Sequence, residues 1–420
     1  MPFWRRTVCD HLPTIPPATD DPAVSSRLRR FVPVGGAVAF TMWAAAVVQG
    51  YSQATVTATL PFTREALGLS EGEASAVLAV TRLAALGALL FSLWADHRGR
   101  RRPILVAFTL MVVAAGSTAL AGGAGPFALS QSVVRATSGA VAALGIVWLA
   151  ERLDPVRRAI GLSLFAAASS FGAGLALLSL PLAEADPRLP FLISLLGLIL
   201  IPLMGRFMSE SPQFVPLQPR RRPLAALVEK PWRSRLLLIT GAAFMAASFT
   251  SVGIAFSTER LVNQLHLSTT TAAVVSLSAG TIGAVGLFVG GRLADGWGRR
   301  PTSALALLIS AAAGVTFYRA TSLPLVIAAL TVSAFATFAY VPAFSAHRSE
   351  LFPTTVRATA GTTAHTAGTL GSAAGLAFGS LVIDQWGLGS TISALALACL
   401  AGAALTLFLP ETRGEDLTSP

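Results

Sequence analysis

The sequence predicts an all-α membrane protein with twelve transmembrane helices in two pseudo-symmetric six-helix bundles. Hydrophobic residues make up 53% of the chain and charged residues only 12%, about half the roughly 25% that is usual in soluble domains. The apolar residues fall in runs of about 20, the length that crosses a bilayer as a helix. One short charged sequence occurs in each half of the chain, as "WADHRGRRRP" at 94–103 and "LADGWGRRP" at 293–301.

Twelve apolar runs are the predicted spans. Small residues recur within them, as in "GAGLALLSL", and in lipid such residues let helices approach closely. In chain order the spans are 34–57, 74–94, 103–123, 126–150, 159–182, 190–208, 236–258, 271–293, 302–319, 323–346, 358–383 and 388–409.

The basic residues predict the orientation in the membrane. Of the 31 lysines and arginines, 25 lie in the tails, loops and adjoining span ends on one side, and four lie in the loops and an adjoining span end on the other side. Arg82 and Arg135 lie well inside spans. Because positive loops stay in the cytoplasm, both termini are expected there, with the chain a multi-pass protein of the inner or plasma membrane. The formal charge of +11 is therefore attributed to topology, and no nucleic-acid partner is expected.

The charged repeat predicts how the domains are organised. Asp96 follows the second of the first six spans, and Asp295 follows the second of the next six, 199 residues later. A duplicated six-helix unit suggests two bundles that rock around a midplane cavity in alternating access. The predicted parts are an N-terminal cytoplasmic tail at 1–33, a first bundle at 34–208, a cytoplasmic connector at 209–235, a second bundle at 236–409 and a C-terminal cytoplasmic tail at 410–420.

Several classes of protein and site are not expected. Two cysteines give no disulfide framework or zinc site, and no metal or other cofactor is predicted. The acidic, proline-containing N-terminus argues against a cleaved signal peptide. No HExxH, phosphate-binding loop or pair of carboxylates inside a predicted span is present, so the chain is predicted not to be an enzyme.

The two charged loops resemble the signature loops of the major facilitator superfamily, and the likeness covers nearly the whole chain. Further stretches resemble its sugar-porter-like branch and the related organic-ion symporters. They are "SESP" at 209–212, "ELFPTTVRATAG" at 350–361, "LPETRG" at 409–414, and "AERLDP" at 150–155 as the first-half counterpart of "SELFPT".

This resemblance implies a conformational latch at the cytoplasmic side. Carboxylates and arginines of the loops would pair across the seam when the cavity faces outward, and separate when it faces inward. The alternative is charge that serves topology alone, although arginine without the two aspartates would satisfy topology. The latch candidates are Asp96, Arg100, Arg101, Glu151, Arg158, Asp295, Arg299, Arg300, Glu350 and Arg357.

The resemblance also implies which helices line the substrate cavity. Their polar and aromatic residues could equally be structural, either bonded to their own helix or packed between helices. The candidates are Gln49, Tyr51, Gln53, Arg135, Phe249, Thr250, Tyr340 and His365.

Arg135 has no carboxylate in any predicted span to face, so a substrate carboxylate, phosphate or sulfate would serve as its partner. The alternative is an arginine that reaches the interface. Arg82 either joins Arg135 or lines a water-filled passage. His365 is the only histidine inside a span and is either a proton-coupling group or a neutral, hydrogen-bonded residue.

These residues predict a secondary active or facilitated transporter of a small organic anion, acting as a monomer in the lipid bilayer. The glutamine pair of sugar porters is missing from "MAASFTS", and Ser52 stands where proton-coupled members carry aspartate, so a coupling proton stays open. Alternatives are a drug or metabolite efflux antiporter and a transporter-like sensor that moves nothing. The sequence does not specify the substrate, the direction or the coupling ion.

Overall fold

The computed structural model describes residues 36–153, 158–210, 232–352 and 354–413, and the regular structure in those parts is helical. Ten helical stretches there are long and apolar enough to cross a membrane. The last of them runs from Ala360 to Leu407 and breaks at Gly387, where φ is 75°, so it makes two crossings. Together with α1, which has 23 residues, the chain makes the twelve predicted crossings.

The first half contains the following elements: α1 (Gly36–Ala58), α2 (Leu60–Ala66), α3 (Glu71–Ala84), η2 (Ala85–Gly87), α4 (Ala88–Arg98), α5 (Arg101–Ser117), η3 (Thr118–Leu120), α6 (Ala124–Arg152), α7 (Arg158–Leu178), α8 (Leu180–Ala185), α9 (Leu189–Ile193), η4 (Ser194–Ile199) and α10 (Leu200–Phe207). The second half contains α12 (Trp232–Ala255), α13 (Ser257–Glu259), η5 (Arg260–Gln264), α14 (Thr269–Trp297), α15 (Arg299–Arg319), α16 (Leu323–Glu350) and α17 (Thr354–Leu407). The second crossing is α3, η2 and α4 in sequence, and the sixth is α9, η4 and α10.

Close helix contacts repeat between the two halves. A Cβ at Gly172 in α7 would lie 2.0 Å from the carbonyl oxygen of Val47 in α1. A Cβ at Gly371 in α17 would lie 2.1 Å from the carbonyl oxygen of Phe244 in α12. The first crossing of each half therefore packs against the fifth, backbone to backbone, as small residues permit in lipid.

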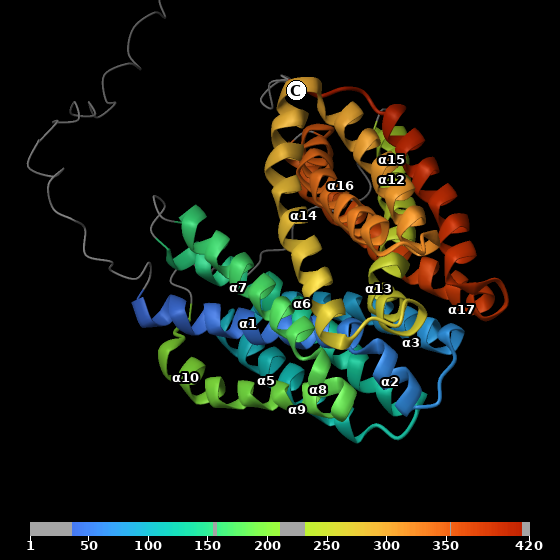
Figure 1. Ribbon diagram of the computed structural model, residues 1–420. Helices are drawn as coiled ribbons and strands as arrows, with labels where there is room; N and C mark the ends of the chain where they lie inside the picture. Colours follow the sequence, from blue (N-terminus) through green and yellow to red (C-terminus); the bar gives the residue numbers. More distant parts are fainter. Residues whose placement is uncertain (1–35, 154–157, 211–231, 353, 414–420) are drawn as a thin grey trace, which may run out of the picture.

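The two bundles meet at one end and diverge toward the other (Figure 1). The described side-chain hydrogen bonds between the halves come from α2, α3, α8 and their surroundings on one side and from α13, η5, α14 and α17 on the other. We call this the closed end. We call the other end, with the α4–α5 and α14–α15 junctions, the open end.

The predicted tails at 1–33 and beyond 413, and most of the connector, lie outside the described residues. The structure therefore leaves the predicted domain limits as predictions.

Candidate functional site

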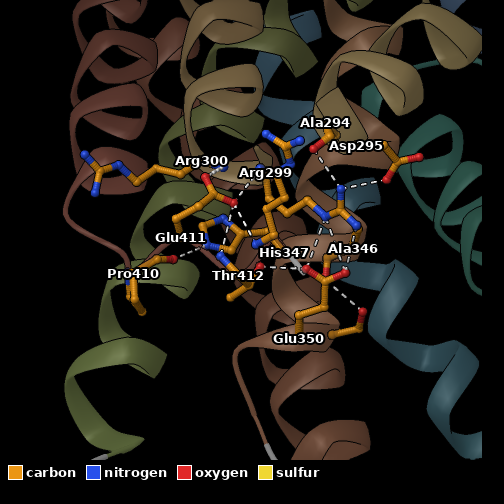
Figure 2. Close-up of polar contacts among 12 residues, drawn as sticks. Ala294, Asp295, Arg299, Arg300, Ala346, His347, Glu350, Pro410, Glu411 and Thr412 are labelled. Atoms are coloured by element: carbon orange, nitrogen blue, oxygen red, sulfur yellow. Dashed lines mark hydrogen bonds and ion pairs between the residues drawn. The ribbon is translucent and has the colours of Figure 1, made fainter. Parts of the chain in front are cut away.

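At the open end each half carries an equivalent ion-pair cluster. In the second half the Arg299 guanidinium lies 3.2 Å from the Glu350 carboxylate and 2.7 Å from that of Asp295 (Figure 2). In the first half Arg100 lies 3.4 Å from Glu151. Each arginine also donates to the backbone carbonyl five residues before it. These ion pairs fasten the second, third and fourth crossings of one half together.

A glutamate that follows the last crossing of each half caps the third crossing. Glu411 accepts the backbone N–H groups of Arg299 and Arg300 at 2.8 and 3.0 Å. Glu210 does the same for the backbone N–H groups of Arg100 and Arg101 at the start of α5, at 2.6 and 3.2 Å. A carboxylate at a helix N-terminus satisfies free N–H groups and complements the helix dipole, which explains the acidic residue in both "SESP" and "LPETRG".

The ionised form of Glu411 is favoured by this arrangement. Two more backbone N–H groups, those of Thr412 and Arg413, donate to the same carboxylate at 3.1 Å each. Partial burial opposes ionisation, but the four donors outweigh it, so the pKa of Glu411 lies below its ordinary value.

Glycine is required where each capped helix begins. Gly298 has φ 118° and Gly99 has φ 94°, a conformation that other residues rarely adopt. A Cβ at Gly298 would also lie 2.5 Å from Glu411, and one at Gly99 would lie 2.4 Å from Glu210. Both glycines therefore allow a tight turn and the close approach of the capping glutamate.

Further hydrogen bonds attach the end of each half to its cluster. Arg101 Nη2 donates to the carbonyl of Gly205 at 2.7 Å, and Arg300 Nη1 to that of Leu409 at 3.4 Å. Three latch candidates have side chains that lie outside the described residues, namely Asp96, Arg158 and Arg357.

The fourth crossing of each half also bonds to the segment after the last crossing, through residues for which the sequence predicted no function. Trp148 donates to the carbonyl of Ser209 at 3.1 Å, and His347, at the equivalent place 199 residues later, bonds to that of Pro410 at 2.9 Å. The two positions are 199 residues apart, as Asp96 and Asp295 are, and this spacing was the sequence feature that could have linked them.

In this conformation the described partners of Arg100, Arg101, Arg299 and Arg300 lie within their own halves. The predicted pairing across the seam would belong to the conformation in which the open end has closed, and it stays a prediction. Asp295 is free enough to take part, because its side chain is 76% exposed.

The glutamines of α1 form a chain of hydrogen bonds with α7. Gln49 donates to Gln53 at 2.7 Å and accepts from Ser169 of α7 at 2.8 Å. Tyr51 is also buried, and its hydroxyl donates to the carbonyl of Pro190 at 2.8 Å. Gln49 and Tyr51 are therefore engaged inside the first half, while Gln53 is half-buried.

Three candidates of the second half are engaged within it. Phe249 is buried against Gly314 of α15. Thr250 donates to the carbonyl of Ala246 in its own helix at 3.0 Å. Tyr340 stacks on Phe344 with ring centroids 4.8 Å apart, and its hydroxyl is buried without a described partner.

His365 lies differently, because its side chain is exposed. It shares a face of α17 with Leu376, about three turns away, whose carbonyl accepts the hydroxyl of Ser75 from the first half at 2.6 Å. His365 is therefore on the face directed at the first half, about three turns from the Ser75 contact toward the start of α17.

Arg82 and Arg135 lie close to the midpoints of their spans, which run from Glu71 to Ala95 and from Ala124 to Leu149. Arg82 is two turns from Ser75 on the face of α3 that is directed at the second half. The two guanidinium charges interact, and among the described residues neither has a carboxylate partner. Arg82 Nε is buried and makes no hydrogen bond to the described residues.

The closed end carries an ion pair between the halves that the sequence had not indicated. Arg64 Nη2 donates to Glu259 at 2.7 Å, and the Glu259 side chain is fully buried. Asn263 donates to Glu259 and to Glu65 of the first half, both at 2.9 Å. Although burial opposes it, the Glu259 carboxylate raises the pKa of Arg64 above its ordinary value.

Two smaller contacts complete the closed end. Asp384 of α17 accepts from the hydroxyl of Ser70 at 2.6 Å and from the backbone N–H of Gly72 at 2.9 Å. Thr269 of α14 donates to Glu184 at 2.6 Å. Ser70 also forms a capping box with Glu73 at the start of α3. This S-x-x-E pattern is the sequence feature that could have predicted the helix start here.

Comparison with known families decides the identity of the fold. The model of the Major Facilitator Superfamily matches residues 42–258 and 237–420. The chain belongs to this superfamily. It is therefore a multi-pass membrane protein that transports a small solute by alternating access, and it is not an enzyme.

Several solved transporter structures share the fold. A bacterial homolog of the human lysosomal transporter Spinster, in an inward-facing and unoccupied conformation, superposes with a TM-score of 0.76 at 16% identity, covering 90% of this chain and 97% of that one. A D-xylose-proton symporter gives 0.71 at 19% identity, with 90% and 99% covered. The inward-open xylose transporter XylE from E. coli gives 0.68 at 18% identity, with 90% and 97% covered. A search of curated proteins finds no match.

Proposed function

We propose that this superfamily member transports a small organic anion, which binds at Arg135 in the middle of the membrane. The observation that supports this most directly is an arginine at mid-span without a carboxylate partner among the described residues. Arginine stays charged and its planar fork fits carboxylate and phosphate groups. A charge held at this depth is costly unless a partner compensates it, and an anionic substrate supplies that partner.

We also propose the orientation, with the open end in the cytoplasm. The arginine-rich loops surround that end, in agreement with the positive-inside rule. On this assignment the structure is inward-open, the inner or plasma membrane is the location, and the monomer is the functional unit. Ser52 occupies the place of the aspartate of proton-coupled members and is buried, so the proposal includes no proton site on α1.

The test is anion uptake into proteoliposomes by purified variants. Arg135→Ala is expected to lower kcat/KM for anions by about 30-fold or more, since removing one partner of a desolvated charge pair costs at least about 2 kcal/mol. Arg188→Ala, which removes an exposed arginine beyond the spans, is the matched control. Undiminished uptake of every transported anion by Arg135→Ala would overturn the proposal.

A further inference from the structure

We infer that Arg82 and Arg135 form one binding site for a small dianion, such as a dicarboxylate. This inference rests on the proposed function and narrows its substrate class. It starts from the observation that two arginines, rather than one, lie near the midpoints of neighbouring crossings, where their charges act on each other.

The helices that carry the two arginines pack against each other. A Cβ at Gly87 would lie 3.0 Å from that of Ala136, and one at Gly139 would lie 3.3 Å from that of Ala88. The second and fourth crossings therefore run side by side in the same direction. From these contacts, Arg82 and Arg135 differ in level by about 6 Å along the helix axes, a difference that two long side chains can span.

The described protein supplies no negative charge to this pair. Among the described ionisable groups, Arg82 is the one whose charge acts on Arg135, and the two positive charges repel each other. No described charge acts on Arg82 favourably. The four described ion pairs of the molecule all lie at its two ends.

The two positive charges of Arg82 and Arg135 then indicate how many negative charges the ligand carries. A monoanion in the site would leave one guanidinium without a counter-charge each time the cavity closes around it. A dianion neutralises both, and two carboxylates, or two oxygens of one phosphate, match two guanidinium forks. The ligand class that fits is therefore a compact molecule with two negative charges.

The first arm of the test uses the wild-type protein in detergent. Binding is measured by thermal stabilisation at neutral pH with succinate, its monomethyl ester and succinamide, and with inorganic phosphate to separate organic from inorganic dianions. Succinate is expected to bind more tightly than the monoester by roughly 30-fold or more. Equal affinity for the diacid and the monoester would overturn the inference.

The second arm separates the roles of the two arginines. Arg82→Gln is expected to abolish the preference for succinate over its monoester while weak binding of the monoester persists, and Arg82→Lys to retain part of that preference. Arg135→Ala is expected to abolish both. If Arg82→Gln keeps the wild-type preference, the two-arginine site is wrong and anion binding at Arg135 still stands.

If Arg135→Ala also binds both probes normally, the proposed function fails as well. Should Arg82→Gln not fold, the wild-type comparison and Arg82→Lys still decide the question. Phosphate binding with no response to succinate would contradict the organic class.

Discussion

At the scale of single residues, the open-end clusters depend on a glycine and a glutamate in each half. Gly298 combines a positive φ with a carboxylate where its Cβ would lie. Gly296, two residues earlier in α14, has open space around the same position. Substituting Gly298 therefore tests the cap, and the same substitution at Gly296 is its control.

Gly298→Ala is expected to destabilise the second half by about 1–3 kcal/mol, from backbone strain and displacement of Glu411. Gly296→Ala is expected to leave stability within about 0.5 kcal/mol of the wild type or to raise it slightly. Thermal unfolding in detergent, followed by tryptophan fluorescence, measures both. Equal melting temperatures for the two variants would contradict the geometry of the cap.

Glu411 makes stability depend on pH. Its folded-state pKa lies below the unfolded value, so its contribution is fully present above the unfolded pKa of about 4.3 and is lost as pH falls through the folded pKa. Glu411→Gln is therefore expected to lower the melting temperature at pH 7, and the difference from wild type is expected to shrink below about pH 4. A difference that stays constant from pH 7 to pH 3 would show that the charge is not involved.

At the scale of helices, the closed end is held by contacts between elements that are far apart in sequence. Arg64 and Glu259 are 195 residues apart, and Glu259 is fully buried. Removing one member of such a pair strands a buried charge, which costs about 3–5 kcal/mol. A change of that size moves a two-state equilibrium by two orders of magnitude or more.

Arg64→Ala is therefore expected to shift the population toward a conformation with this end open. Spin-label distances between α3 and α17 report the shift as a longer component. Arg64→Ala combined with Glu259→Ala is expected to restore part of the wild-type distribution, because no buried charge remains unpaired. Arg188→Ala is the control. If the shifts of the two single variants simply added in the double variant, the Arg64–Glu259 ion pair would not be what holds this end closed.

Sequence reasoning succeeded for the spans because each one satisfies a simple length and hydropathy requirement, and for the duplication because the loops around Asp96 and Asp295 are nearly identical. It could not choose the face of a helix that lines the cavity. Lipid and a helical core are both apolar, so the amphipathic signal that orients a soluble helix is absent. Phe249 and Tyr340 pack within the second half, and their place in the substrate cavity stays a prediction.

The contacts at the closed end could not be predicted from the sequence for another reason. Arg64 and Glu259 follow the first and seventh crossings, in short segments outside the two repeated charged loops. Their meeting depends on how the two bundles are placed against each other. The capping role of Glu210 and Glu411 likewise became visible only when the ends of α10 and α17 were found beside the starts of α5 and α15.

At the scale of the whole molecule, two mid-membrane arginines without a carboxylate partner among the described residues restrict how the carrier can cycle. Occluding both without a ligand costs several kcal/mol for each buried charge. The empty carrier is therefore expected to reorient slowly and the loaded carrier quickly, which is the kinetic behaviour of an exchanger.

Uptake of labelled succinate is expected to be at least about tenfold faster into proteoliposomes preloaded with unlabelled succinate than into empty ones. A proton gradient is expected to have little effect, and His365→Asn is expected to leave the rates unchanged. Equal rates into loaded and empty vesicles would rule out exchange. Gradient-driven uptake that His365→Asn abolishes would assign proton coupling to His365.

The capping glutamates also bear on how the protein is made. Every described group of the first cluster is present once the ribosome has added residue 210, before any crossing of the second half exists. The second cluster waits for Glu411, after the twelfth crossing. The first bundle can thus be fastened while translation continues, whereas the second must remain unfastened until synthesis is nearly complete, which makes it the half more exposed to membrane quality control.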